Sequence, residues 1–107
     1  MFLYTHYKFI TSMKLEDLYK TIKERQVKPS EGSYVASMFI QGEDRIIQKV
    51  GEEAVEVVIA AKNKDKGRIV SEVSDLWFHL LILLVAKGIS IDDILDELQK
   101  RAKEKRV

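Results

Sequence analysis

Two stretches decide the fold of this chain: residues 49–62, KVGEEAVEVVIAAK, and residues 71–88, SEVSDLWFHLLILLVAKG. Each sets acidic residues in otherwise apolar sequence, as E-E-x-x-E in the first and as E-x-x-D in the second. An unpaired charge is costly to bury, so carboxylates within apolar segments indicate a partner that neutralises them. We therefore expect a shared cation. The acidic residues are Glu52, Glu53, Glu56, Glu72 and Asp75.

Helical geometry places these acids on two stripes. Because a helix turns by about 100° per residue, the glutamates of the first stretch and Arg45 all fall within about 60° of Lys49. In the second stretch, Glu72, Asp75 and His79 fall within about 60° of one another. The remaining surface of both helices is almost wholly aliphatic or aromatic. Both stretches are therefore expected to be helices that are apolar over most of their circumference.

The polar segment NKDKG, residues 63–67, separates the two helices. Such a short connection favours an antiparallel pair, in which the two acidic stripes face each other across one seam. Five converging carboxylates would repel one another unless a divalent cation neutralised them. Ligands that are all oxygen favour Mg²⁺, with Mn²⁺ as the alternative, over zinc or copper. Magnesium in turn suggests chemistry on phosphates.

The rest of the chain also reads as helices. Apolar residues recur at steps of three and four in residues 15–25, and a last amphipathic helix is expected over residues 91–103. The central pair should span residues 43–62 and 68–86. Residues 27–41 hold the only proline and are expected to be a loop suited to a substrate lid. The sequence therefore predicts an all-α, four-helix chain.

Composition limits the possible partners. The chain has 107 residues, 46% of them hydrophobic, which fits one globular domain over residues 13–107 preceded by an extension over residues 1–12. Its net charge of +1 gives no field for nucleic acid or a membrane surface. The longest apolar run, residues 80–86, is too short to cross a bilayer. We expect a cytoplasmic protein that forms a homodimer or homotetramer, because four helices cannot cover such apolar surfaces.

Simpler interpretations exist for individual residues. Glutamates at i and i+4 usually form a solvated helix face, and it is the presence of two acid clusters bordered by aliphatics that favours a metal site. His79 lies in a leucine-rich helix and is expected to be a hydrogen-bonded core residue. Trp77 and Phe78 are expected to serve core or interface packing.

Three segments carry a resemblance to a known family. GSYVASMF, KVGEEAVEVVIAAKN and EVSDLWFHLLILLVAKGIS resemble the HisE family, the phosphoribosyl-ATP pyrophosphohydrolases of histidine biosynthesis, within the all-α MazG-like nucleotide pyrophosphatases. The resemblance extends from about Met13 to the end of the chain. The paired acid motif is shared across the superfamily, whereas K-V-G-E-E-A-x-E and D-L-x-x-H-L-L select this member.

The resemblance implies a Mg²⁺-dependent hydrolase of acid anhydrides that converts phosphoribosyl-ATP to phosphoribosyl-AMP and pyrophosphate. It assigns Glu53, Glu56, Glu72 and Asp75 as metal ligands and leaves Glu52 as a further ligand or as the base that orients water. Lys49 would contact phosphate oxygens. The other substrate-binding residues that it implies are Arg45, Lys62, Ser33 and Tyr34. The product would pass to a separate cyclohydrolase.

Two positions depart from the family pattern. Val35 stands where a threonine is common, so a hydroxyl near the phosphates is missing, and Phe78 stands where tyrosine is frequent. Two other functions stay open at this point. One is a house-cleaning pyrophosphatase of free nucleoside triphosphates, and the other is a non-catalytic helical oligomerisation module. A di-iron carboxylate bundle is disfavoured, because paired Glu-x-x-His motifs are absent.

Overall fold

The computed structural model describes residues 13–104, which form helices and loops and contain no strand. The expectation of four helices is corrected to five within this range: α2 (Leu15–Val27), α3 (Tyr34–Gln41), α4 (Glu43–Lys62), α5 (Lys66–Lys87) and α6 (Ile91–Lys103). The all-α class and the predicted central pair are confirmed. The expected extension, residues 1–12, lies outside the described residues.

Helix α3 is the element that the sequence did not predict, since residues 27–41 were expected to be a loop throughout. The hydroxyl of Ser33 caps the helix by accepting from the Ala36 amide at 3.2 Å. Gly42 ends it with φ +101°, a conformation that strongly favours glycine. Ala36 and Met38 are buried, and this burial holds the short helix in place.

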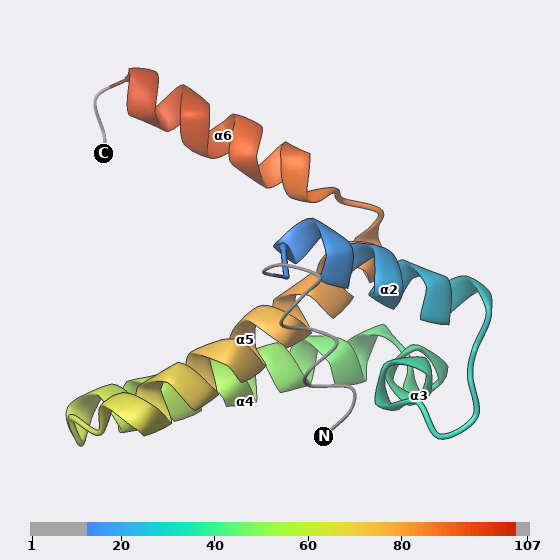
Figure 1. Ribbon diagram of the computed structural model, residues 1–107, viewed down its shortest axis with the longest axis horizontal. Coiled ribbons are helices and arrows are strands. Elements are labelled where there is room, and N and C mark those ends of the chain that lie inside the picture. The colour runs from blue at the N-terminus through green and yellow to red at the C-terminus, as the bar shows by residue number, and fades with distance from the viewer. Residues whose placement is uncertain (1–12, 105–107) are drawn as a thin grey trace.

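The antiparallel hairpin of α4 and α5 is the longest feature of the molecule (Figure 1). Lys64, with φ 59°, reverses the chain after α4, and the Asp65 side chain then caps α5 by accepting from the Arg68 amide at 3.2 Å. At the other end of the hairpin, the Lys87 ammonium lies 2.6 Å from the Glu43 carboxylate. The hairpin therefore fixes the register in which the two helices face each other.

The core lies at one end of this hairpin, where α2 and α3 pack against the start of α4 and the end of α5. The phenol of Tyr19 adds a bond across this core by donating to the Ile89 carbonyl at 2.9 Å. The buried residues of this cluster are Tyr19, Ile22, Met38, Ile46, Leu81, Ile82 and Val85. The far half of the hairpin is left with apolar side chains exposed, among them Val55, Val58, Ile59 and Val70.

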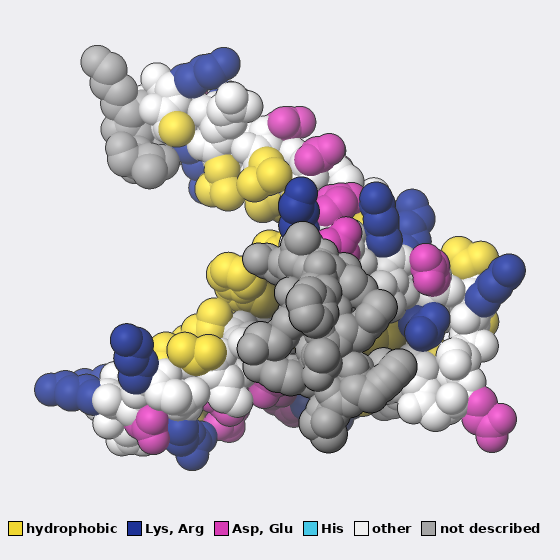
Figure 2. Space-filling model, in the orientation of Figure 1, with side chains coloured by type: hydrophobic (Ala, Val, Ile, Leu, Met, Phe, Trp, Pro, Cys, Tyr) yellow, Lys and Arg dark blue, Asp and Glu magenta, His cyan; other side chains and the backbone are white. Residues whose placement is uncertain are grey.

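Helix α6 leaves the hairpin at Gly88 and extends away from it (Figure 1). Ser90 caps it by accepting from the Asp93 amide, yet none of its residues is buried. Figure 2 shows apolar side chains lining both sides of the opening between α5 and α6. This groove, of about 360 Å³, is lined by Leu15, Trp77, Leu80, Leu81, Leu84, Ile91, Ile94, Leu95 and Leu98.

By length and composition alone, α5 is apolar enough to cross a membrane. It also carries Glu72 and Asp75 on one face and packs along α4, and a single helix of this kind is weak evidence for a membrane span.

Candidate active site

The α4–α5 hairpin brings three carboxylates to one point. Glu53 reaches it from α4, and Glu72 and Asp75, one turn apart, reach it from α5. One oxygen from each residue lies within 4.8 Å of the others. Glu53 and Glu72 are partly buried and Asp75 is exposed, so the cluster lies at the mouth of the seam between the helices. We call these three residues the acidic cluster.

Lys49 lies beside the acidic cluster, one turn before Glu53. Its Nζ is 3.3 Å from a Glu53 oxygen and 3.7 Å from a Glu52 oxygen. Burial lowers the pKa of Lys49, but the bond to Glu53 and the nearby Tyr34, Glu53 and Glu52 raise it more, so the net shift is upward. The ammonium is therefore charged at neutral pH and partly offsets the negative charge of the cluster.

The other predicted acids of α4 lie outside this cluster. The Glu52 side chain is directed along α4. Its carboxylate accepts a hydrogen bond from the side-chain amide of Gln48 at 3.0 Å and lies 3.8 Å from the Arg45 guanidinium. Glu56 is partly buried on the same stripe but is not a member of the acidic cluster. The structure thus brings together three of the five predicted carboxylates and leaves two beside them on α4. Lys62, the last residue of α4, is exposed.

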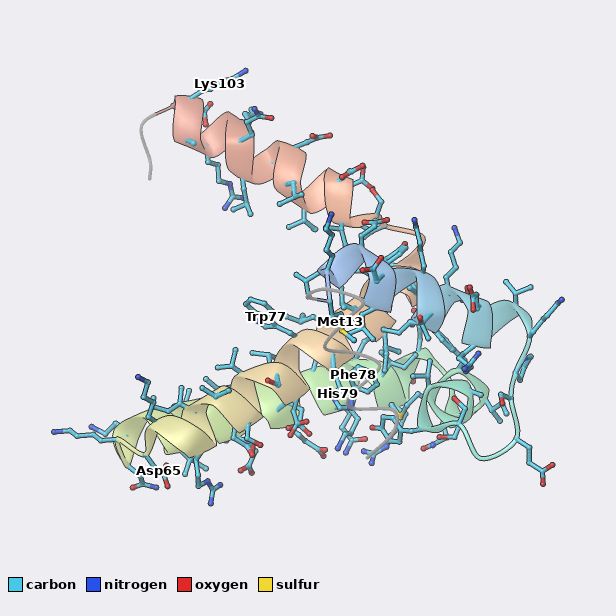
Figure 3. All side chains as sticks on the ribbon, viewed as in Figure 1. Met13, Asp65, Trp77, Phe78, His79 and Lys103 are labelled. Carbon is cyan, nitrogen blue, oxygen red and sulfur yellow. The ribbon has the colours of Figure 1, made fainter. Side chains whose placement is uncertain are left out.

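The predicted substrate-binding residues Ser33 and Tyr34 form the start of α3. The Ser33 hydroxyl is used as the helix cap. The Tyr34 hydroxyl lies 2.7 Å from Nε2 of His79, whose Nδ1 lies 2.7 Å from the Asp75 carbonyl oxygen. Figure 3 shows that His79 and Trp77 lie on different sides of α5. His79 is only 5% exposed, which confirms it as a hydrogen-bonded core residue.

The contact between Tyr34 and His79 is not predicted by the sequence. The spacing of His79 four residues after Asp75 did indicate that the imidazole shares the acidic stripe. No local pattern could place Tyr34 against it, because the two residues are 45 positions apart in the chain. Gln48 was also missed, although its position four residues before Glu52 is the sequence signal for their bond.

The donor set of the acidic cluster matches one kind of ion. All three ligand atoms are carboxylate oxygens, and no histidine or cysteine belongs to the group. Hard divalent cations such as Mg²⁺ prefer such donors, whereas zinc and copper sites favour nitrogen or sulfur. Glu53, Glu72 and Asp75 could therefore hold a hard cation, with further positions on it left to water and a phosphate.

The fold and the site together define a class of protein. It is an all-α protein in which an antiparallel helical hairpin brings carboxylates from both helices together beside a lysine, an arrangement suited to binding phosphates through a cation. Comparison with known proteins specifies which kind. The model of the family described as phosphoribosyl-ATP pyrophosphohydrolase matches residues 15–102. The chain belongs to this family, and the match includes the entire acidic cluster.

Individual relatives agree with this family. A phosphoribosyl-ATP pyrophosphatase of Listeria monocytogenes is 56% identical over 87 residues, which cover 81% of this chain and 84% of the relative. The Listeria innocua protein of the same name is 53% identical over the same shares. A histidine biosynthesis bifunctional protein of Caldanaerobacter subterraneus is 54% identical over 90 residues. The chain spans only 44% of the length of that bifunctional relative.

Proposed function

We propose that this protein hydrolyses phosphoribosyl-ATP to phosphoribosyl-AMP and pyrophosphate in the cytoplasm, as a step of histidine biosynthesis. Membership of the family and the names of relatives that the chain covers almost completely support this substrate. The observation that carries the proposal is the convergence of Glu53, Glu72 and Asp75 within 4.8 Å beside Lys49. Relatives that are bifunctional support a cyclohydrolase activity as the consumer of the product.

In this proposal, Glu53, Glu72 and Asp75 would hold Mg²⁺, or Mn²⁺ in its place, and Glu56 on the next turn of α4 would be a fourth ligand. When bound, the cation neutralises charge on the triphosphate and polarises a phosphoryl oxygen. The carboxylates contribute by position: two come from one helix and one from its antiparallel neighbour, so the hairpin holds the ion in a fixed place. No covalent intermediate with the protein is needed.

Lys49 and Glu52 have complementary roles in this mechanism. The Lys49 ammonium is paired with Glu53 at 3.3 Å, and it would contact phosphate oxygens of the substrate. Arg45, which lies 3.8 Å from Glu52, adds a second positive charge on the same face of α4 as Lys49. Glu52 is oriented by the Gln48 amide and accepts a proton from the attacking water. Water then joins one phosphorus while the bond to the bridging oxygen breaks, and pyrophosphate leaves.

A homo-oligomer belongs to the same proposal. The radius of gyration is 15.8 Å, compared with about 13 Å for a compact domain of this length. The accessible surface is 8316 Å², whereas a compact monomer of 12.4 kDa exposes about 6,100 Å². Apolar residues of α4, α5 and α6 account for part of this excess, among them Val58, Trp77 and Leu95. A second copy of the chain that covers these faces would complete the core.

The experiment is incubation of the purified protein with phosphoribosyl-ATP and Mg²⁺ while pyrophosphate is measured. We expect release that stops with chelator and with Glu53→Gln, and that persists with Glu97→Gln, which removes an exposed carboxylate of α6. Hydrolysis of free deoxynucleoside triphosphates with no action on phosphoribosyl-ATP would instead indicate a house-cleaning enzyme. An oligomer without any hydrolysis would indicate a non-catalytic module.

A further inference from the structure

Tyr34 of α3 and His79 of α5 form a hydrogen-bonded pair in which the direction of each proton can be deduced. Nδ1 of His79 lies 2.7 Å from the Asp75 carbonyl oxygen. A carbonyl can only accept, so the imidazole proton is on Nδ1. In that tautomer the ring offers a lone pair at Nε2, which lies 2.7 Å from the Tyr34 hydroxyl. Tyr34 therefore donates its single hydroxyl proton to His79.

The direction of this hydrogen bond, which we call the polarity of the Tyr34–His79 pair, limits what Tyr34 can bind. A phenol that has donated its proton keeps only acceptor capacity on its oxygen. Its ring is stacked on Phe78, with centroids 6.0 Å apart and an interplanar angle of 28°, and it meets His79 edge-on. These contacts hold the hydroxyl against a buried acceptor. A fully ionised phosphate has no proton to give, so Tyr34 in this arrangement does not bind one.

The pair also borders the acidic cluster. His79 follows Asp75 by one helical turn and is bonded to that residue's own carbonyl. Tyr34 also lies near Lys49, whose ammonium is bonded to Glu53 and whose pKa Tyr34 helps to raise. Tyr34 is 46% exposed, so part of its side chain is open to a ligand. Through His79 its hydroxyl is linked to Asp75 of the acidic cluster.

We propose that Tyr34 accepts a hydrogen bond from a hydroxyl or amino group of the bound nucleotide, and that His79 is a positioning residue that fixes the phenol in this polarity. The inference rests on the proposed function, because the nucleotide is the proposed substrate. It assigns Tyr34 to recognition of the sugar or base, whereas Lys49 is assigned to the phosphates.

The polarity itself can be tested without activity. The chain has two histidines, His6 and His79, so the long-range ¹⁵N–¹H spectrum of the imidazoles is simple to assign with a His6→Gln variant. We expect the Nδ1–H tautomer of His79, and we expect Tyr34→Phe to shift the Nε2 resonance. A proton on Nε2 of His79 in the native protein would overturn the inference. This result is decisive even if the protein does not hydrolyse phosphoribosyl-ATP.

The recognition role is tested by matched tyrosine variants. Tyr34→Phe should lower kcat/KM for phosphoribosyl-ATP by about tenfold, mainly through KM, as one hydrogen bond is lost. The control is Tyr19→Phe, which removes a phenol that donates to the Ile89 carbonyl far along the chain and should lower stability without changing KM. Unchanged kinetics in Tyr34→Phe, in protein whose wild type is active, would overturn the role.

Substrate analogues identify the donor. The penalty of Tyr34→Phe should vanish on analogues that lack one ribose hydroxyl if that hydroxyl is the donor. It should vanish on an analogue in which oxygen replaces the exocyclic nitrogen of adenine if the amino group is the donor. Persistence of the penalty across the whole set would contradict a hydrogen bond to the nucleotide.

Two substitutions at His79 separate positioning from packing. Gln can place an acceptor oxygen near the position of Nε2, whereas Leu fills space without any acceptor. We expect His79→Gln to keep most of the wild-type KM. His79→Leu should match Tyr34→Phe, and the double variant should be no worse than either, because the two residues act as one unit. Additive losses at constant thermal stability would show that His79 does not act through Tyr34.

Discussion

Nζ of Lys49 lies 3.3 Å from a carboxylate oxygen of Glu53, one turn further along α4, and both side chains are partly buried. This ion pair stands at the edge of the acidic cluster, where Glu53 has two roles. It pairs with the lysine in the protein alone, and in our proposal it would also be a ligand of the cation. Lys49 would then contact the phosphates.

Asp75→Asn should reduce Mg²⁺-dependent pyrophosphate release by about a hundredfold to a thousandfold, because one charged ligand is lost. It should not unfold the protein, since Asp75 is exposed and the change relieves repulsion within the cluster. Thermal denaturation adds a second readout. At a tenfold excess over its dissociation constant, Mg²⁺ should stabilise the native chain by about 1.4 kcal/mol, and much less in the variant.

The control for that measurement is Asp96→Asn, which alters an exposed carboxylate on α6 and should keep both the activity and the response to Mg²⁺. Equal stabilisation of native protein and Asp75→Asn by Mg²⁺ would argue against the acidic cluster as the binding site.

Lys49→Met should weaken substrate binding and remove a pH-dependent part of stability. Since the folded pKa of Lys49 is raised above 10.5, its stabilisation is fully present below that pH and is lost as pH rises through the raised value. Urea unfolding in the presence of chelator, at pH 8 and at pH 11, measures the contribution of Lys49 to the free energy of unfolding. The stability difference between native protein and variant should narrow at the higher pH. A constant difference would mean that the charge of Lys49 does not contribute.

Leu95→Glu should convert the proposed oligomer to a monomer. Leu95 is 53% exposed and lines the apolar groove between α5 and α6, so a charge there would have to be buried beneath a second copy. Analytical ultracentrifugation reports the change. The matched control is Gln99→Glu, which adds the same charge on α6 outside the groove lining and should leave the assembly intact. A native chain that sediments as a monomer would remove the basis for this prediction.

Two glycines offer a paired test of the backbone. Gly42 separates α3 from α4 with φ +101°, so Gly42→Ala should destabilise the protein by about 1 kcal/mol or more. Gly51 is within α4, and an added methyl group there meets nothing within 4 Å. Gly51→Ala should therefore stabilise the helix by about 0.5–1 kcal/mol. Changes of opposite sign in the free energy of unfolding, measured with urea, would support the backbone conformation described for each glycine. Destabilisation by Gly51→Ala would instead indicate a close neighbour at that face in the assembled protein.

Sequence alone determined the parts of this protein that depend on local periodicity. The helices predicted over residues 15–25, 43–62, 68–86 and 91–103 are present, with ends that differ by at most two residues. They follow from apolar spacing, and the last of them also from its capping residue Ser90, which acts within one turn. The short turn after α4 also predicted the antiparallel hairpin. Because the helices are antiparallel and each turns by about 100° per residue, the sequence also predicted that Glu53 faces Glu72 and Asp75.

Only the tertiary structure decided the rest. Helix α3 is too short for its period to show in the sequence, and it forms because Ala36 and Met38 are buried against other helices. Burial and hydrogen bonding along α4 direct Glu53 into the cluster and Glu52 toward Gln48 and Arg45, although both occupy the same stripe. The bond between Tyr34 and His79 joins residues 45 positions apart. Contacts of this kind depend on how whole helices pack, and the local sequence does not encode that packing.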